Sequence, residues 1–110
     1  MGLMPFLRVK HGIGSASFIS LEDISTFRIG GLQKDHRNKD IVTLQVWSIG
    51  SDSPTLITLE ISHKAVDAFA EILVETIEAA RANSCKIICD IEELVRAAEF
   101  RVKQEVFTHV

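Results

Sequence analysis

Apolar and polar residues alternate in short runs through the first half of the chain. Between residues 6 and 61 the runs are FLRVK, SASFIS, ISTFRI, IVTLQVWSI and TLITLEI. Alternation of this kind, with many β-branched and aromatic residues, is typical of strands that bury one face. The connecting segments HGIG, LED, GGLQKDHRNKD and GSDSP are rich in residues that form turns. Because a parallel crossover needs a dozen or more residues, we expect a five-stranded antiparallel β-meander.

The alternation also assigns the side chains of these strands to two faces. The face expected to form the core collects aliphatic residues and one phenylalanine: Leu7, Val9, Phe27, Ile29, Val42, Leu44, Val46, Ile57, Leu59 and Ile61. The opposite face carries the cations Arg8, Lys10 and Arg28 around Trp47, the only tryptophan of the chain. We therefore expect one buried sheet face and one polar, partly basic face.

After Ser62 the apolar residues change to a helical spacing. The pattern predicts a helix over about residues 63–82, with Ser62 as its N-cap and Asn83 at its end. Ile72 lies on a flank beside small alanines, which another helix could approach closely. One apolar stripe should pack on the sheet: Val66, Phe69, Ala70, Leu73, Ile77 and Ala80. The acidic residues on the remaining side form either a solvated face or a strip that meets a basic surface: Asp67, Glu71, Glu75 and Glu78.

A second helix is predicted over about residues 90–107. It begins with the sequence DIEE at residues 90–93, which has the form of a capping box before an apolar pattern. Phe100 and Phe107 lie nearly opposite the inner stripe of this helix. Either another part of the same subunit covers the two rings, or a second copy does. Because burying an aromatic ring is worth roughly 1.5–3 kcal/mol, we favour self-association, with Ile72, Phe100 and Phe107 in the oligomer interface.

The composition is that of an ordinary globular protein. Its 110 residues are 46% hydrophobic and 25% charged, which suits a single α+β domain over residues 1–110, with both C-terminal α-helices packed on one sheet face. A net charge of −3 is not that of a protein that binds nucleic acid mainly through phosphates. The two cysteines are too few for a disulfide framework, and no apolar run reaches the ~18 residues of a membrane span. We therefore expect a cytoplasmic protein with no membrane segment.

The connector over residues 30–40 is the densest cluster of candidate chemistry. Its glycines, Asp, Asn and cations are normal where a chain turns back through solvent, so a loop tip explains them. The alternative is that this loop closes over an anion bound on the basic sheet face. Cations beside an aromatic ring can hold a nucleotide, another anionic small molecule or single-stranded nucleic acid. The residues of this predicted anion site are Arg8, Lys10, Arg28, Lys34, His36, Arg37 and Trp47.

Enzyme and cofactor signatures are largely missing from the sequence. The segment HGIGS lacks the third glycine and the following helix of a dinucleotide fingerprint. Cys85 and Cys89 have the wrong spacing for a zinc knuckle, and the four histidines lie far apart along the chain. No nucleophile elbow of the form G-x-S-x-G occurs. We therefore expect no metal, no cofactor and no enzyme, but a self-associating binding module that holds a protein partner or a small ligand at a subunit interface.

Overall fold

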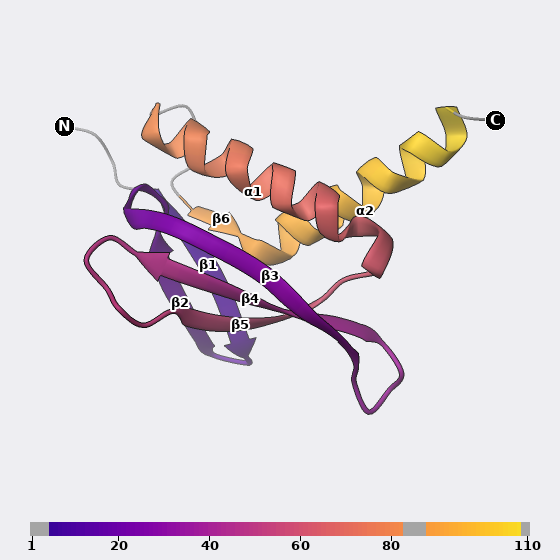
Figure 1. Cartoon of the computed structure of the whole chain (residues 1–110), viewed down its shortest axis with the longest axis horizontal. Coiled ribbons are helices and arrows are strands. Elements are labelled where there is room, and N and C mark those ends of the chain that lie inside the picture. Colours follow the sequence, from indigo (N-terminus) through magenta and orange to yellow (C-terminus); the bar gives the residue numbers. More distant parts are fainter. Residues whose placement is uncertain (1–4, 83–87, 109–110) are drawn as a thin grey trace.

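The predicted strands form two separate sheets (Figure 1). The computed structural model describes residues 5–82 and 88–108, with the backbone alone for 105–108. In the first sheet, β1 (Phe6–Gly12) pairs antiparallel with β2 (Ser15–Ser20) and parallel with β6 (Ile88–Asp90). The hydrophobic pattern did not predict β6, because a strand of three residues is too short to show alternation. We call this sheet the β1 sheet.

In the second sheet, the β4 sheet, β4 (Asp40–Ser48) pairs antiparallel with β3 (Ile24–Lys34) and β5 (Thr55–Glu60). The division between the sheets falls at η1, the short 3-10 helix Leu21–Asp23. The side chain of Leu21 is fully buried there, which turns the chain away from β2 before β3 begins. The α+β class is confirmed, whereas a single five-stranded meander is not, because the strands are divided between two sheets.

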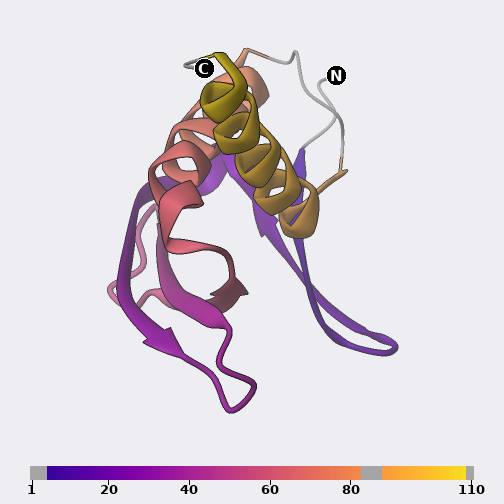
Figure 2. The same ribbon diagram turned by 90° about the vertical axis from the view of Figure 1, so that its right-hand side faces the viewer.

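Both predicted helices are present. The 3-10 helix η2 (His63–Ala65) leads into α1 (Val66–Arg81), and β6 leads directly into α2 (Ile91–Thr108). Asn83, the expected end of the first helix, lies outside the described residues. In Figure 2 both helices lie across the top of the molecule, and the two sheets splay apart below them. Neither helix, over the range that the structure describes, is long and apolar enough to cross a membrane.

One hydrophobic core joins the helices to both sheets. Leu7 of the β1 sheet, Leu44 of the β4 sheet and Phe69 of α1 are each at most 1% exposed. The predicted core face is confirmed. Phe27 and Ile29 are partly buried against the core. The other residues of the predicted face are buried: Leu7, Val9, Val42, Leu44, Val46, Ile57, Leu59 and Ile61.

The three residues expected at an oligomer interface have different surroundings. Ile72 is only 8% exposed and belongs to the core of its own subunit, so it offers little surface to another chain. Phe100 is 61% exposed on α2. Phe107 lies in the last turns of α2, where its side chain is outside the described part of the structure.

Candidate functional site

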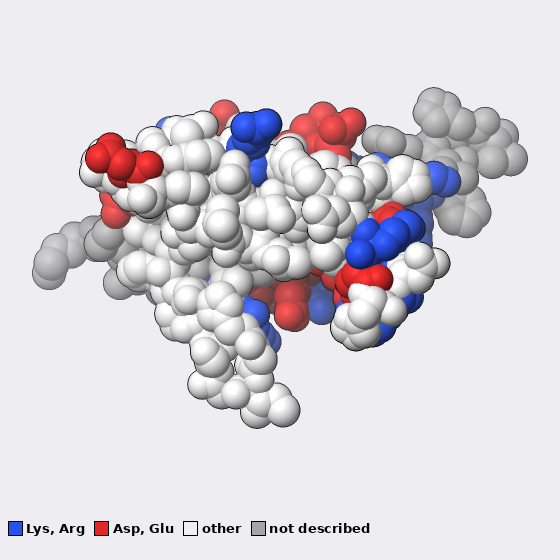
Figure 3. Space-filling view, turned by 60° about the horizontal axis from the view of Figure 1, so that its bottom comes forward, with Lys and Arg blue, Asp and Glu red and all other residues white. Residues whose placement is uncertain are grey.

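The basic sheet face predicted around Trp47 is divided between the two sheets. Arg8 and Lys10 belong to β1, whereas Arg28 and Trp47 belong to the β4 sheet. Arg28 borders a shallow recess of about 370 Å³ beside Gly30 and Gly31. In Figure 3, charged side chains of both signs gather at the right, over the β3–β4 hairpin, and the middle of the view is largely uncharged. The structure thus brings Arg28 near Trp47 but does not join Arg8 and Lys10 to them.

Arg8 holds the start of α2 on β1. Its Nε and Nη2 atoms donate hydrogen bonds to Asp90 Oδ1 and Oδ2, at 2.5 and 2.7 Å. These residues are partners in the parallel register of β1 and β6. The bonds from Arg8 keep the pKa of Asp90 below its ordinary value, and the charges of Lys10 and Arg96 contribute in the same direction. The guanidinium of Arg8 is therefore committed to a neighbour within the subunit.

The predicted connector over residues 30–40 is shorter in the structure, because β3 continues to Lys34 and β4 begins at Asp40. The remaining residues 35–39 form a turn organised by Asp35. The carboxylate of Asp35 accepts hydrogen bonds from the backbone N–H groups of Arg37 and Lys39, both at 2.9 Å. These bonds, the one from Lys39 first, lower the pKa of Asp35 below its ordinary value. Asn38 adopts a positive φ of 63°, which asparagine tolerates well.

The cations of this connector are mostly paired. Arg37 Nη2 lies 3.0 Å from Asp35 Oδ2 and 2.8 Å from Glu60 Oε2. Lys34 Nζ pairs with Asp40 Oδ1. His36 is exposed at the tip. These pairs join the connector to the strands beside it and leave little free positive charge for an anion.

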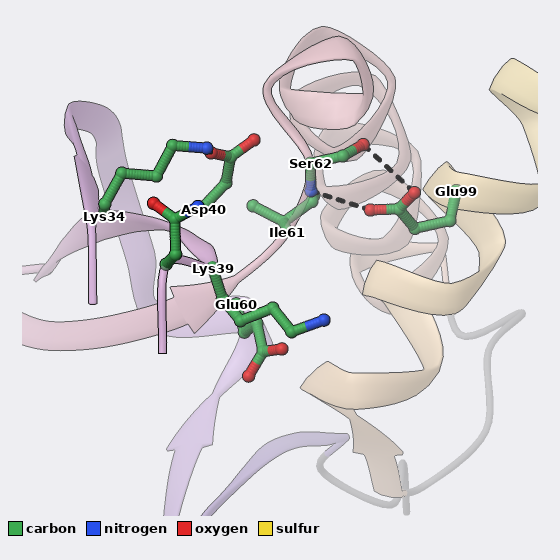
Figure 4. A pocket seen from close by; sticks show the side chains of 8 residues that line it. Lys34, Lys39, Asp40, Glu60, Ile61, Ser62 and Glu99 are labelled. Carbon is green, nitrogen blue, oxygen red and sulfur yellow. Dashed lines mark hydrogen bonds and ion pairs between the residues drawn. The ribbon is translucent and has the colours of Figure 1, made fainter. Parts of the chain in front are cut away.

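A polar pocket of about 340 Å³ lies at the base of the hairpin (Figure 4). Asp40 is its most strongly perturbed group, because Lys34 Nζ and both the ring and the backbone N–H of His63 surround its carboxylate. The hydrogen bond from Lys34, followed by those from His63, lowers the pKa of Asp40 to about 2. Asp40 therefore stays ionised at any physiological pH.

Glu99 of α2 closes the other side of this pocket. Its carboxylate accepts the Ser62 backbone N–H at 2.8 Å and the Ser62 hydroxyl at 3.1 Å (Figure 4). Ser62 therefore does not cap its own helix as predicted, because its side chain makes no capping bond and its hydroxyl donates to Glu99. No spacing rule links Glu99 to a residue 37 positions earlier, so the sequence did not predict this contact.

The groups around the pocket do not form a catalytic arrangement among the residues described. His63 Nδ1 lies 3.2 Å from Asp40 Oδ2, which is the carboxylate–imidazole half of a catalytic triad. The nearest hydroxyl in sequence, that of Ser62, donates instead to Glu99. Within residues 5–82 and 88–104, no group of three or more His, Cys, Asp or Glu side chains could hold a metal ion. Cys85, one of the two cysteines considered for metal binding, lies outside this range.

A larger recess, the inter-sheet groove, lies where β1, β5 and the first turns of α2 meet. Its volume is about 400 Å³, within the range of ligand pockets. Its apolar floor comes from all three elements: Val9, Ile57, Leu59, Ile91 and Val95. Its polar rim consists of Lys10, Thr58, Glu60, Glu92 and Arg96. The sequence marked most of the floor residues as core, but only the splaying of the sheets leaves a recess over them.

The charges on the rim of the groove are not all balanced. Glu60 is paired with Arg37. The side chains of Lys10 and Arg96 form no ion pair with the other described residues, and both act on the carboxylate of Asp90 through space. Lys10 and Arg96 therefore remain available to a ligand near Asp90, and Glu92 is the carboxylate of the rim that has no ion-pair partner among the described residues. Lys10 is the one member of the predicted anion site that lines this groove.

Comparison of the chain with protein-family models, with curated proteins and with solved structures finds no match.

Proposed function

We propose that this chain is a non-enzymatic binding module that holds a segment of a protein partner in the inter-sheet groove. The groove itself is the observation that supports this function. Ligand sites are usually concave and largely apolar, with a few polar groups that fix orientation. The groove combines an apolar floor of Val9, Ile57 and Leu59 with the free charges of Lys10 and Arg96.

Binding is favoured over catalysis by the roles of the polar groups in the neighbouring pocket. Asp40 joins the hairpin to η2, and Glu99 fixes the start of the same helix. Each of these groups has a structural task that accounts for its position. The groove offers no nucleophile beside a base in the described part of the chain, since its hydroxyl is that of Thr58 alone.

The proposal is tested by titrating the 15N-labelled protein with a peptide panel that includes extended, helical and proline-rich members. Amide shifts are expected at residues 57–60, 91, 92, 95 and 96, which line the groove. Val95→Arg places a long side chain in the groove and should weaken binding about tenfold or more. Ala97→Arg, an exposed position on the same helix, serves as the control and should bind like the wild type. If no member of the panel shifts the groove amides, the proposed function is wrong.

Self-association is a second candidate, and the exposure of Phe100 favours it. The ring is 61% exposed on a helix whose opposite side packs on the core. With Ile72 buried in the core, Phe100 is the described residue that supports the predicted interface. A symmetric dimer that joined two copies of α2 would cover this ring.

Light scattering combined with size exclusion tests this interface. The wild type is expected to have a mass above 12.2 kDa, and Phe100→Lys is expected to restore that of a single chain. Leu56→Lys on the outer face of the β4 sheet is a matched control, because Leu56 is 62% exposed. A wild type that remains a single chain at high concentration, or a dimer that only Leu56→Lys dissociates, would contradict an interface at Phe100.

An anionic ligand at the predicted basic face has weaker support. Of the seven residues proposed for it, Arg8, Lys34 and Arg37 are in ion pairs. The emission of Trp47 on addition of nucleotides and short oligonucleotides at low salt is the direct test, and a change that added salt reverses would support this alternative.

A further inference from the structure

Building on the proposed groove function, we propose that the ligand is an extended peptide that adds as a strand to β5 and directs a carboxylate to Lys10 and Arg96. On two walls of the groove, backbone groups lack a neighbouring strand among the described residues, and two unpaired cations lie near Asp90. Strand addition of this kind takes its affinity from main-chain hydrogen bonds and its specificity from alternate side chains.

One wall of the groove is the free edge of β5, the outermost strand of the β4 sheet. The backbone N–H of Ile61 donates to the carbonyl of Asp40 at 3.2 Å, which fixes the direction of every bond along this ladder. Because the direction alternates along an antiparallel strand, Ile57 and Leu59 bond to β4. The N–H and C=O groups of Thr58 and Glu60 therefore point away from β4, and both residues line the groove.

The other wall is the second half of β1. The backbone N–H of Leu21 donates to the carbonyl of Pro5 at 3.1 Å, so by alternation Val9 bonds to β2 and Lys10 points the other way. β6 covers that edge only as far as Arg8, because its chain turns into α2 after Asp90. Beyond Arg8, the backbone of Lys10 faces the groove without a strand beside it among the described residues.

A single inserted strand meets both walls. It would continue the β1 sheet where β6 ends and extend the β4 sheet beyond β5, so that the two sheets become one. Successive side chains of a strand point to opposite faces. Every second residue of the ligand is therefore expected to be apolar and to lie on Ile57, Leu59 and Val95, with the residues between them facing solvent.

The charge of the groove selects the end group of the ligand. Lys10 and Arg96 are unpaired among the described residues and lie close enough to Asp90 to help lower its pKa. On the β5 side of the groove, Glu60 is already paired with Arg37, whereas Glu92 of α2 has no ion-pair partner among the described residues. A carboxylate, from an acidic side chain or from the end of the partner chain, complements the two unpaired cations, Lys10 and Arg96.

The first experiment uses the peptide acetyl-Val-Thr-Val-Thr-Val-Asp and two N-methylated versions of it. One version carries N-methyl groups on the threonines, and the other on the second and third valines. Backbone groups of the two residue types point to opposite edges of the strand, so each version blocks one edge. Dissociation constants are measured by titration of the 15N-labelled wild type, with the amides of Thr58 and Glu60 as the signal.

Each N-methylated version lacks two N–H donors on one edge and is expected to bind at least about tenfold more weakly than the parent, which corresponds to about 1.4 kcal/mol or more. A peptide with Asn-amide in place of the terminal Asp should also bind more weakly, and added salt should reduce the difference. If both N-methylated versions bind as tightly as the parent, strand addition is wrong although the groove still binds. If the parent fails where helical or proline-rich peptides succeed, this inference is wrong and the proposed function stands.

A pair of variants tests the β5 wall from the protein side. Thr58→Pro removes the N–H on the groove side and leaves the bonds to β4, and proline is tolerated on edge strands. It is expected to weaken binding of the parent peptide about tenfold. Thr58→Val keeps the N–H, so it should bind about tenfold more tightly than Thr58→Pro. If both variants bind the parent peptide with equal affinity, the ligand does not pair with β5. If Thr58→Pro does not fold, the affinities of the N-methylated peptides for the wild type provide the test instead.

Discussion

Asp40 is a residue of β4 at which polar contacts from β3 and η2 meet. Its carboxylate binds Lys34 of β3, and the N–H and ring of His63 in η2. The composition of residues 30–40 predicted a loop rich in charge, and only residues 35–39 form it, held by the bonds of Asp35. The partners of Asp40 and Arg37 were not predictable, because His63 and Glu60 are each 23 residues away in sequence.

The stability that Asp40 contributes should depend on pH. Its pKa is about 2 in the folded chain, against an ordinary 3.8, so the contribution is fully present above pH 3.8 and is lost as the pH falls through 2. The wild type should therefore have a higher melting temperature than Asp40→Asn at pH 6, and the difference should vanish near pH 2. Asp52→Asn, in the exposed β4–β5 turn, is the control. A difference that stays constant from pH 6 to pH 2 would contradict the low pKa.

At the scale of elements, α2 determines where α1 begins. Glu99 accepts two hydrogen bonds from Ser62, so the junction between β5 and η2 is held by a helix that comes later in the chain. On the opposite side of the helices, Arg101 lies 3.5 Å from Glu75 and 3.6 Å from Glu71. The acidic strip predicted on α1 therefore meets a cation of α2 within the subunit as well as solvent.

Removing the Glu99 carboxylate should loosen the start of α1. Glu99→Ala leaves two donors of Ser62 without their acceptor, and hydrogen bonds to a charged group are worth about 1.5–3 kcal/mol. Urea unfolding should show a loss of free energy of unfolding of about that size, with Glu99→Gln between the wild type and Glu99→Ala. Lys103→Ala, exposed on the same helix, should change the free energy by less than about 0.5 kcal/mol. Equal effects at both positions would mean that the bonds to Ser62 contribute nothing.

The elements themselves were largely predictable. Alternation located all five antiparallel strands, and helical spacing located α1 and α2 to within a few residues. The local pattern of apolar residues predicts these elements because each of them buries one face. The period of the buried residues is then visible over six or more positions. β6 escaped prediction because it has three residues and is stabilised by pairing with a strand more than 80 positions earlier.

At the scale of the whole molecule, one core connects two sheets that share no hydrogen-bonded strand. Leu7, Leu44 and Leu73 come from three elements and are all fully buried. A substitution at any of these leucines should therefore lower the stability of both sheets. This arrangement also explains why the inter-sheet groove can be open without exposing the core.

Leu44→Ala should destabilise both sheets together, although Leu44 belongs only to the β4 sheet. The expected loss is about 2–5 kcal/mol, the usual cost of removing a buried leucine side chain. Trp47 fluorescence reports the β4 sheet, and a fluorine label on Phe18 reports the β1 sheet. Both signals should shift to the same lower urea midpoint, and a shift confined to Trp47 would mean that the sheets unfold separately.

The sequence by itself determined the α+β class, the five antiparallel strands, both α-helices and most residues of the core, because these follow from the period of apolar residues along each segment. The tertiary structure alone decided that the strands divide into two sheets, that Arg8 binds Asp90 and that a groove opens between β1 and β5. These features depend on contacts between segments far apart in the chain. The free energy of such contacts comes from packing and pairing in three dimensions, which no local pattern of residues records.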